Sequence, residues 1–255
     1  MRSLRTALSG ALGALAASAL AASAVAQPSS LRDQLFGAPS DGRRGAMPSV
    51  ARFIPDDGEP FILDRSAGGQ VLLRFETSPE IWALTPTPGP RGDVIYKNDM
   101  GETVLRATRL GGVTLFTPDR PSGVAAALVG PGAMLRPSPI LSTNALLQIF
   151  LQSSARAGRA AGHAMSFEFE ADSPPPTATT LVADAATVVA EAFVGIARTG
   201  ERGRRTLAKF VKVRFELGGA PATIARGDTL RVIIAPERGL AGRPSSHRIE
   251  AALKR

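Results

Sequence analysis

The sequence predicts an α+β protein in which a β-rich N-terminal half is followed by two main helices interleaved with antiparallel strands. Three observations lead to this prediction. Between residues 51 and 130, short runs alternate apolar and polar residues and are separated by turn residues, as in antiparallel strands. From residue 138 to residue 255, two longer runs repeat apolar residues at helical spacing. A stretch dense in Gly and Pro, residues 130–139, separates the two patterns.

The N-terminus has the layout of a secretory signal peptide. Arg2 and Arg5 precede an apolar run over residues 7–25, which ends in the small-residue sequence Ala-Val-Ala before Gln27. We therefore expect residues 1–26 to be cleaved and the protein to be exported, periplasmic or secreted. Residues 27–50 are rich in Ser, Gly, Pro and Arg and predict a flexible lead-in.

Composition narrows the possible functions. The chain has no Cys, which excludes disulfides, thiolate metal ligands, cysteine nucleophiles and a lipid-anchored cysteine after the apolar run. The formal net charge is +8, and a positive surface favours polyanionic partners. With one Trp and one Tyr, the chain lacks the aromatic residues of a base-stacking surface, so nucleic acid is not expected as a partner. After residue 26 we expect no membrane-spanning segment.

The β-rich region, residues 51–130, is predicted as a meander of six to eight short strands that forms a sandwich or a small barrel. Residues 52–54 and 61–63 flank a turn of Pro, Asp and Gly, and residues 70–76 alternate between a core face and a solvent face. Residues 81–84 form a short strand. Residues 91–117 predict three strands joined by turns at 98–101 and 109–112, and residues 124–129 a last strand.

Four of these segments support a family resemblance: residues 61–66 (FILDRS), 79–84 (PEIWAL), 71–76 (VLLRFE) and 91–117. In them the chain resembles a family of uncharacterised exported bacterial proteins, described as a domain of unknown function, over most of the sequence. The resemblance implies no activity, no cofactor and no site residue.

The α+β region, residues 138–255, begins with a helix from about residue 142 to 162, capped by Ser142, Thr143 or Asn144. Its apolar run at 146–151 predicts deep burial. A strand at 165–169 follows. A second helix begins after three prolines and extends to about residue 198, and its period can continue past Gly200 to residue 207. Residues 209–217 and 229–235 predict strands, residues 223–225 a brief pairing, and residues 244–253 a closing helix capped by Ser245 or Ser246.

Candidate catalytic groups are few. The only histidines are His163, at a helix end, and His247, three residues before Glu250 on one helical face, where a surface ion pair is the expected role. No third ligand accompanies them, so no metal site is predicted. Asp57 and Asp93 lie in turns of the β-rich region and are the alternative catalytic pair of a carboxylate-dependent hydrolase. Turn aspartates more commonly accept backbone hydrogen bonds.

The densest basic cluster follows the second helix and comprises Arg198, Arg202, Arg204, Arg205 and Lys209. It predicts an anion-binding site for an anionic lipid or a cell-wall polymer, and a solvated linker is the competing interpretation. Trp82 and Tyr96 suit a ligand groove but also suit a core. We expect a non-catalytic binding or structural protein of the cell envelope, without cofactor. The alternative is a carboxylate-dependent envelope hydrolase.

Overall fold

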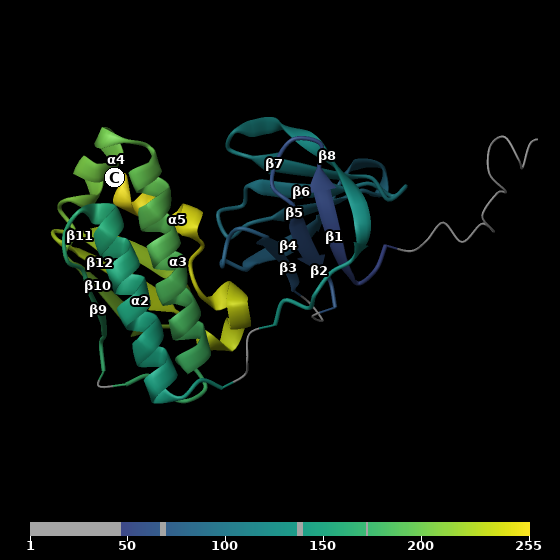
Figure 1. Cartoon of the computed structure of the whole chain (residues 1–255). Helices are drawn as coiled ribbons and strands as arrows, with labels where there is room; N and C mark the ends of the chain where they lie inside the picture. Colours follow the sequence, from purple (N-terminus) through teal and green to yellow (C-terminus); the bar gives the residue numbers. More distant parts are fainter. Residues whose placement is uncertain (1–46, 67–69, 137–139, 172) are drawn as a thin grey trace, which may run out of the picture. The chain divides into compact units, whose positions relative to one another are not determined.

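The computed structural model describes residues 47–66, 70–136, 140–171 and 173–255. The predicted signal peptide, residues 1–26, and nearly all of the predicted lead-in lie outside the described residues. Residues 46–255 form a single compact unit, which holds both a β-barrel and an α+β part with a smaller sheet (Figure 1). The predicted α+β fold class is confirmed.

Eight antiparallel strands form a closed barrel in which each strand pairs with the next along the chain (Figure 1). The barrel closes because the first strand also pairs with the last, with Phe53 opposite Leu128. The sequence predicted either a sandwich or a small barrel, and the structure shows the barrel. The strands are β1 (Val50–Pro55), β2 (Phe61–Asp64), β3 (Val71–Phe75), β4 (Trp82–Pro88), β5 (Val94–Lys97), β6 (Thr103–Ala107), β7 (Val113–Thr117) and β8 (Arg120–Pro131), with the short 3₁₀ turn η1 (Pro90–Gly92) before β5.

The side chains of β5, β6 and β7 point alternately to the inner and the outer face of the barrel wall. Tyr96 pairs with Leu105, which pairs with Leu115, and all three side chains are buried in the barrel core. Because successive side chains of a strand point to opposite faces, Ile95 and Arg106, which pair with each other, lie on the outer face. The outer face of these strands is therefore available to form a site.

The predicted turn at residues 98–101 forms the β5–β6 hairpin. Asn98 Oδ1 accepts hydrogen bonds from the backbone N–H groups of Met100, at 3.0 Å, and Glu102, at 2.9 Å. Gly101 has a φ of 82°, a left-handed conformation that glycine adopts without steric cost. The local sequence thus closes this hairpin by itself, as an Asx-type turn does.

The α+β part carries a four-stranded sheet in the order β11–β12–β10–β9, and its described residues form four α-helices, of which α2 and α3 are the longest. Its elements are α2 (Thr143–Ala161), β9 (Ser166–Phe169), α3 (Thr179–Arg198), α4 (Glu201–Leu207), β10 (Lys212–Leu217), β11 (Ala222–Arg226), β12 (Thr229–Ile234), the 3₁₀ segment η2 (Pro236–Gly242) and α5 (Ser246–Leu253). As expected from the sequence, Ser142 caps α2 by accepting from the N–H of Ala145, and Ser245 caps α5 by accepting from that of Arg248.

The strand directions correct the prediction of antiparallel strands in this region. β10 is parallel to both β9 and β12, and only β11 pairs antiparallel with β12. The reason for the parallel pairing of β9 and β10 is their connection through α3 and α4. These helices carry the chain back to the edge of the sheet at which β9 began, so β10 runs in the same direction as β9.

The helices differ from expectation in two respects. The apolar run of α2 is not deeply buried throughout, since Leu147 and Leu151 are each 54% exposed. The second predicted helix, α3, ends at Arg198. The next helix, α4, is separate, because Gly200 between them has a φ of 85° and a ψ of −147°, which are not helical.

Helix α3 packs against the other three helices of the α+β part, α2, α4 and α5. It is long and apolar enough to span a membrane, with a mean hydropathy of 1.7, contrary to the expectation that no such segment follows residue 26. In the fold, 61% of the apolar 18-residue stretch of α3 is buried. Its buried residues include Val188, Phe193 and Ile196, which belong to the core shared with the sheet. Core helices of globular proteins have this composition as well.

Candidate functional site

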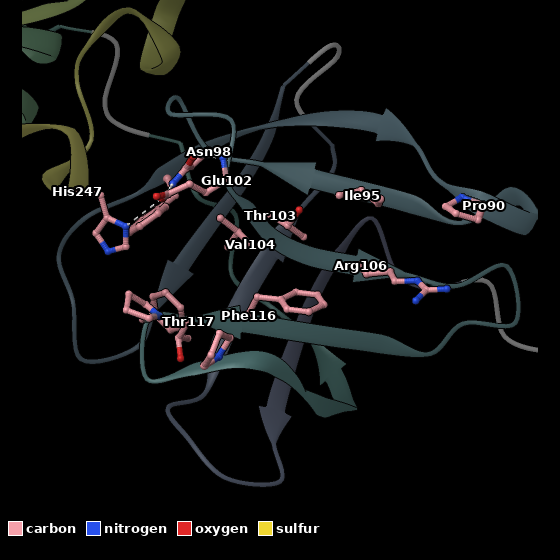
Figure 2. A pocket seen from close by; sticks show the side chains of 14 residues that line it. Pro90, Ile95, Asn98, Glu102, Thr103, Val104, Arg106, Phe116, Thr117 and His247 are labelled. Atoms are coloured by element: carbon pink, nitrogen blue, oxygen red, sulfur yellow. Dashed lines mark hydrogen bonds and ion pairs between the residues drawn. The ribbon is translucent and has the colours of Figure 1, made fainter. Parts of the chain in front are cut away.

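A cavity of about 720 Å³ runs along the outer face of β5, β6 and β7 (Figure 2). Its volume falls within the range of small-molecule sites, roughly 300–1,000 Å³. Most of the lining is apolar, with a few polar groups at the ends. The lining residues are Phe75, Trp82, Pro90, Ile95, Asn98, Glu102, Thr103, Val104, Arg106, Phe116, Thr117, Pro118, Pro121 and His247.

Phe116 forms the middle of the cavity wall, as Figure 2 shows. Its ring lies over Gly123 on the neighbouring strand β8, where an added Cβ would come within 2.7 Å of the ring. Gly123 also has a φ of 84°, so this position requires glycine for both space and conformation. The glycine thereby lets an aromatic ring lie flat along the outer face of the sheet.

One end of the cavity is polar and is formed by Asn98, Glu102 and His247 (Figure 2). Trp82 lies against His247 there. The Asn98 side-chain amide donates to Glu102 Oε2 at 2.8 Å. His247 Nδ1 lies 3.8 Å from the same oxygen. The His247 ring meets the Trp82 ring edge to face, with centroids 4.6 Å apart. Thus α5 of the α+β part completes a site that the barrel begins.

The opposite end contains Arg106 and Pro90 (Figure 2). Arg106 is held by the buried carboxylate of Asp93, with Nε at 2.7 Å and Nη2 at 2.5 Å from Asp93 Oδ2. Asp93 Oδ1 also accepts a long hydrogen bond, at 3.4 Å, from the backbone N–H of Arg109. The positive charge at this end is therefore compensated within the protein.

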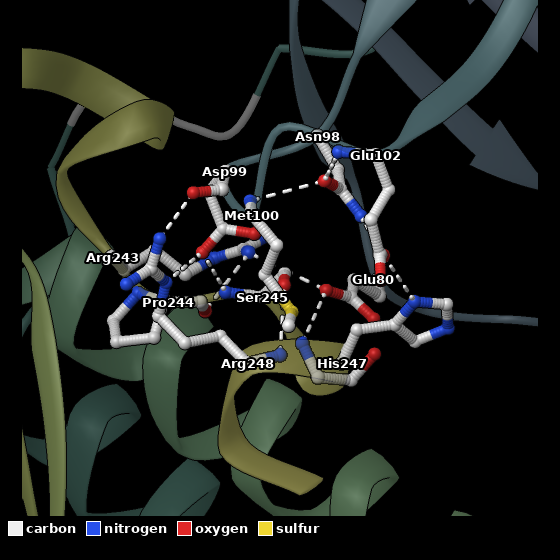
Figure 3. A network of polar contacts seen from close by, with 11 residues as sticks. Glu80, Asn98, Asp99, Met100, Glu102, Arg243, Pro244, Ser245, His247 and Arg248 are labelled. Atoms are coloured by element: carbon white, nitrogen blue, oxygen red, sulfur yellow. Dashed lines mark hydrogen bonds and ion pairs between the residues drawn. The ribbon is translucent and has the colours of Figure 1, made fainter. Parts of the chain in front are cut away.

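A buried ion cluster lies where the segment leading into α5 meets the barrel (Figure 3). The Arg243 side chain is only 2% exposed. It pairs with Asp184 of α3 through Nε, and its Nη1 lies 3.5 Å from Glu80 Oε1. Its Nη2 donates to the Ile81 carbonyl at 2.5 Å. One arginine thus binds α3 and the β3–β4 connection of the barrel together.

The protonation balance of this cluster depends on burial. Burial raises the pKa of the Glu80 carboxyl above its usual value, while the Arg243 charge and the hydrogen bonds from Ser246 oppose that rise. Burial alone would lower the pKa of Arg243, but the carboxylates of Asp184 and Glu80 outweigh it and leave that pKa raised. Arg243 therefore stays charged.

The barrel also supplies carboxylates to the first turn of α5 (Figure 3). The N–H of Ser246 donates to Glu80 Oε1 at 3.0 Å, and the N–H of Ser245 donates to Asp99 Oδ2 at 3.1 Å. Arg248 Nε donates to the same Asp99 oxygen at 2.7 Å. Negative groups at a helix N-terminus are stabilising, because the free N–H groups carry partial positive charge. These contacts fix the position of His247 at the cavity.

The two candidate catalytic aspartates are engaged with separate arginines. Asp57 pairs with Arg120 at the surface, whereas Asp93 holds Arg106. Neither aspartate lines the cavity, and no contact in the described part of the chain joins them. This geometry favours a structural role for both carboxylates, as ion-pair partners, and Asp93 also accepts from a backbone N–H.

The structure brings part of the predicted basic cluster together. Arg202, Arg205 and Lys209 line one shallow hollow with Thr206. Arg198 lines a different hollow, between α2 and α3, with Arg156 and Arg159. Glu201 contacts Arg204 at 3.2 Å and Arg205 at 3.4 Å, which partly neutralises both.

The histidines take different places. The spacing of His247 and Glu250 predicted a surface ion pair between them, and this prediction is wrong. Glu250 contacts Lys254 at 2.8 Å, and His247 lies near Glu102. His163 follows the α2 cap residue Gly162, and its N–H donates to the Gly158 carbonyl at 3.1 Å, in keeping with a helix-end role. Among the described residues no group of His, Asp and Glu is arranged to hold a metal ion.

Sequence reasoning missed several residues of the site. Glu102 and Phe116 were assigned only to a hairpin and a strand, and Arg243 to no role. Phe116 did carry a local signal, since it lies on the outer face of its strand and yet is large and apolar, which suits a site better than a solvated surface. Trp82, singled out for a ligand groove, does line the cavity.

Comparison with known proteins adds one finding. A family model described as "Domain of unknown function (DUF4908)" matches residues 30–253 of the chain. The same comparisons found no curated protein and no solved structure that matches the chain.

Proposed function

Because the chain belongs to the DUF4908 family of domains of unknown function, which brings no activity with it, we propose a function from the site alone. The protein is a non-catalytic binding protein of the cell envelope that takes up a small, largely apolar molecule in the cavity on the outer face of the barrel. The observation that supports this most is the cavity itself, an apolar hollow of about 720 Å³ with a few polar groups at its ends.

The location in the envelope is part of the proposal and rests on the signal-peptide pattern of residues 1–26. A binding role is preferred over catalysis because the polar groups in the cavity do not form a nucleophile with its base. His247 approaches Glu102 and Trp82, and no Ser lies among the lining residues. The carboxylate pair Asp57 and Asp93 lies outside the cavity.

The test uses Trp82, the only Trp in the chain, as a reporter. Titration with the uncharged fluorophore N-phenylnaphthylamine is expected to quench Trp82 emission by energy transfer and to saturate. Replacing Phe116 by Glu puts a charge in the apolar wall, so affinity should fall about tenfold or more, the equivalent of about 1.4 kcal/mol.

Leu110→Glu is the matched control for this substitution. Leu110 is 84% exposed in the β6–β7 turn and does not line the cavity, so binding should stay at the parent level. If neither variant changed the titration, or the parent did not saturate, the cavity would not be the binding site.

A second function, contact with anionic envelope components, is favoured by the hollow that Arg202, Arg205 and Lys209 share. Charges gathered around one hollow can bind phosphate or carboxylate groups, although Glu201 weakens the field at Arg205. This contact would hold the protein at a polyanionic surface and would not compete with the cavity.

The expected result is that the double variant Arg202→Glu, Arg205→Glu loses retention on anionic phospholipid vesicles or on a soluble wall polymer by about tenfold at low salt. The double variant Arg226→Glu, Arg255→Glu makes the same change in net charge at exposed positions elsewhere. Binding of the two double variants to the vesicles and to the wall polymer is compared with that of the parent. This comparison distinguishes a local site from general charge attraction. Equal losses in the two variants would leave only the general attraction.

A further inference from the structure

The charges around the cavity are not balanced. Among the described residues, Glu102 has no Lys or Arg within ion-pair distance, and its neighbours are the Asn98 amide and the His247 imidazole. The Asn98 side chain is fixed by its turn, because its oxygen already accepts two backbone hydrogen bonds. One carboxylate oxygen of Glu102 is therefore occupied, and the other, Oε1, has no partner in the described fold.

The cationic residue of the cavity cannot offset this charge. Arg106 is bound to Asp93 through two nitrogens at 2.7 and 2.5 Å, and the Asp93 side chain is only 6% exposed. Pulling Arg106 away toward a ligand would leave a buried carboxylate without a partner, which is costly. A ligand carboxylate would thus meet an arginine whose charge Asp93 already compensates, whereas a ligand cation would meet the uncompensated charge of Glu102.

The walls next to Glu102 also favour positive charge. Trp82 lies at the same end of the cavity, with His247 against it, and the rings of Phe75 and Phe116 line the cavity farther along. The faces of aromatic rings attract cations through their quadrupole, by about 0.5–2 kcal/mol according to exposure. A cation beside Glu102 therefore gains from both the carboxylate and an aromatic wall.

From these observations, and resting on the proposed binding function, we propose that the cavity selects amphiphilic cations. These are molecules with an apolar body and one positively charged nitrogen group. The charged group lies beside Glu102, and the body lies along Phe116, Val104 and Ile95 toward Arg106. The apolar body supplies most of the affinity, and Glu102 supplies the preference for positive charge.

The test compares three ligands of one chain length: octyltrimethylammonium, octanol and octanoate. Each is titrated into the full chain at one fixed pH, below its micelle concentration where it forms micelles. Trp82 emission is the readout. We expect the ammonium compound to bind about five- to tenfold more tightly than the alcohol, and the carboxylate to bind more weakly than either.

Glu102→Gln keeps the shape of the side chain and its contact with Asn98 but removes the charge. It should lower the affinity for octyltrimethylammonium about five- to tenfold and leave octanol unchanged. Glu237→Gln is the matched control: it makes the same change in net charge at an exposed position of η2 that does not line the cavity, and it should alter no affinity.

Two kinds of failure are distinguishable. If all three compounds bind equally well, or Glu102→Gln changes nothing, the preference for cations is wrong while the binding function stands. Tighter binding of octanoate would overturn the preference as well. If no compound binds and N-phenylnaphthylamine also fails, the binding function itself is wrong.

Discussion

Replacing Arg243 by Met is expected to lower the free energy of unfolding by about 3–5 kcal/mol, the usual effect of removing one partner from a buried ion cluster. Methionine nearly fills the volume of the arginine but leaves Glu80 and Asp184 buried without their positive charge. It also removes the hydrogen bond to the Ile81 carbonyl. Urea-induced unfolding, followed by Trp82 emission and by circular dichroism, measures the loss.

The destabilisation by Arg243→Met should depend on pH. The pKa of Glu80 is already raised by burial, and without Arg243 it must rise further. A carboxyl whose folded pKa is raised contributes stability at low pH, which is lost as the pH rises through that pKa. The variant should therefore be closer to the parent at about pH 5 than at about pH 8.

Two comparisons sharpen this result. The double variant Glu80→Gln, Arg243→Met removes one of the stranded carboxylates and should regain part of the loss. Arg248→Met removes an arginine that is 36% exposed and pairs with Asp99, so it should cost only about 1 kcal/mol. A loss for Arg243→Met no greater than for Arg248→Met, or greater at low pH, would contradict the assignment of Arg243 as the buried centre of the cluster.

Replacing Gly203 by Ala is expected to destabilise the protein by about 3 kcal/mol, near the upper end for overpacking. Gly203 lies inside α4, where alanine would ordinarily stabilise by about 1 kcal/mol. Here an added Cβ would collide with the backbone carbonyl of Ile196 at the end of α3, and with the Thr199 side chain. Because a backbone group cannot rotate away, α4 must move from α3.

Gly219→Ala is the control for this effect. Gly219 has no atom within 4 Å of an added Cβ and no positive φ, so its substitution should change stability by less than about 0.5 kcal/mol. Thermal unfolding of the two variants beside the parent gives the comparison. If Gly203→Ala were neutral or stabilising, the close packing of α4 on the last turn of α3 would be wrong.

The ion cluster bears on function as well as on stability. Glu80 contacts both Arg243 and the N–H of Ser246, the residue before His247. His247 in turn lies against Trp82 and near Glu102 at the polar end of the cavity. The position of one wall of the proposed site is thus set by the buried contacts of the neighbouring residues.

Local features of the fold could be predicted from the sequence because they depend on neighbouring residues. The hairpin at Asn98 and Gly101 needs only an Asx-type turn and a left-handed glycine. The caps at Ser142 and Ser245 need only a hydroxyl before a helical run. The candidate site could be predicted only in part: Trp82 was assigned to a groove or a core, and it both lines the cavity and belongs to the barrel core, but Glu102 and His247 come from segments far apart in the chain.

By itself, the sequence determined the division into a β-rich and an α+β half, the positions of most strands and helices, and the turns between them. These follow from side-chain periodicity and backbone preferences, which act over a few residues. Only the tertiary structure decided the closure of the barrel through β1 and β8, the parallel direction of β9, β10 and β12, and the cavity. It also decided the burial of Arg243 between Glu80 and Asp184. Each of these depends on which distant segments meet, and periodicity along a chain does not specify its partner.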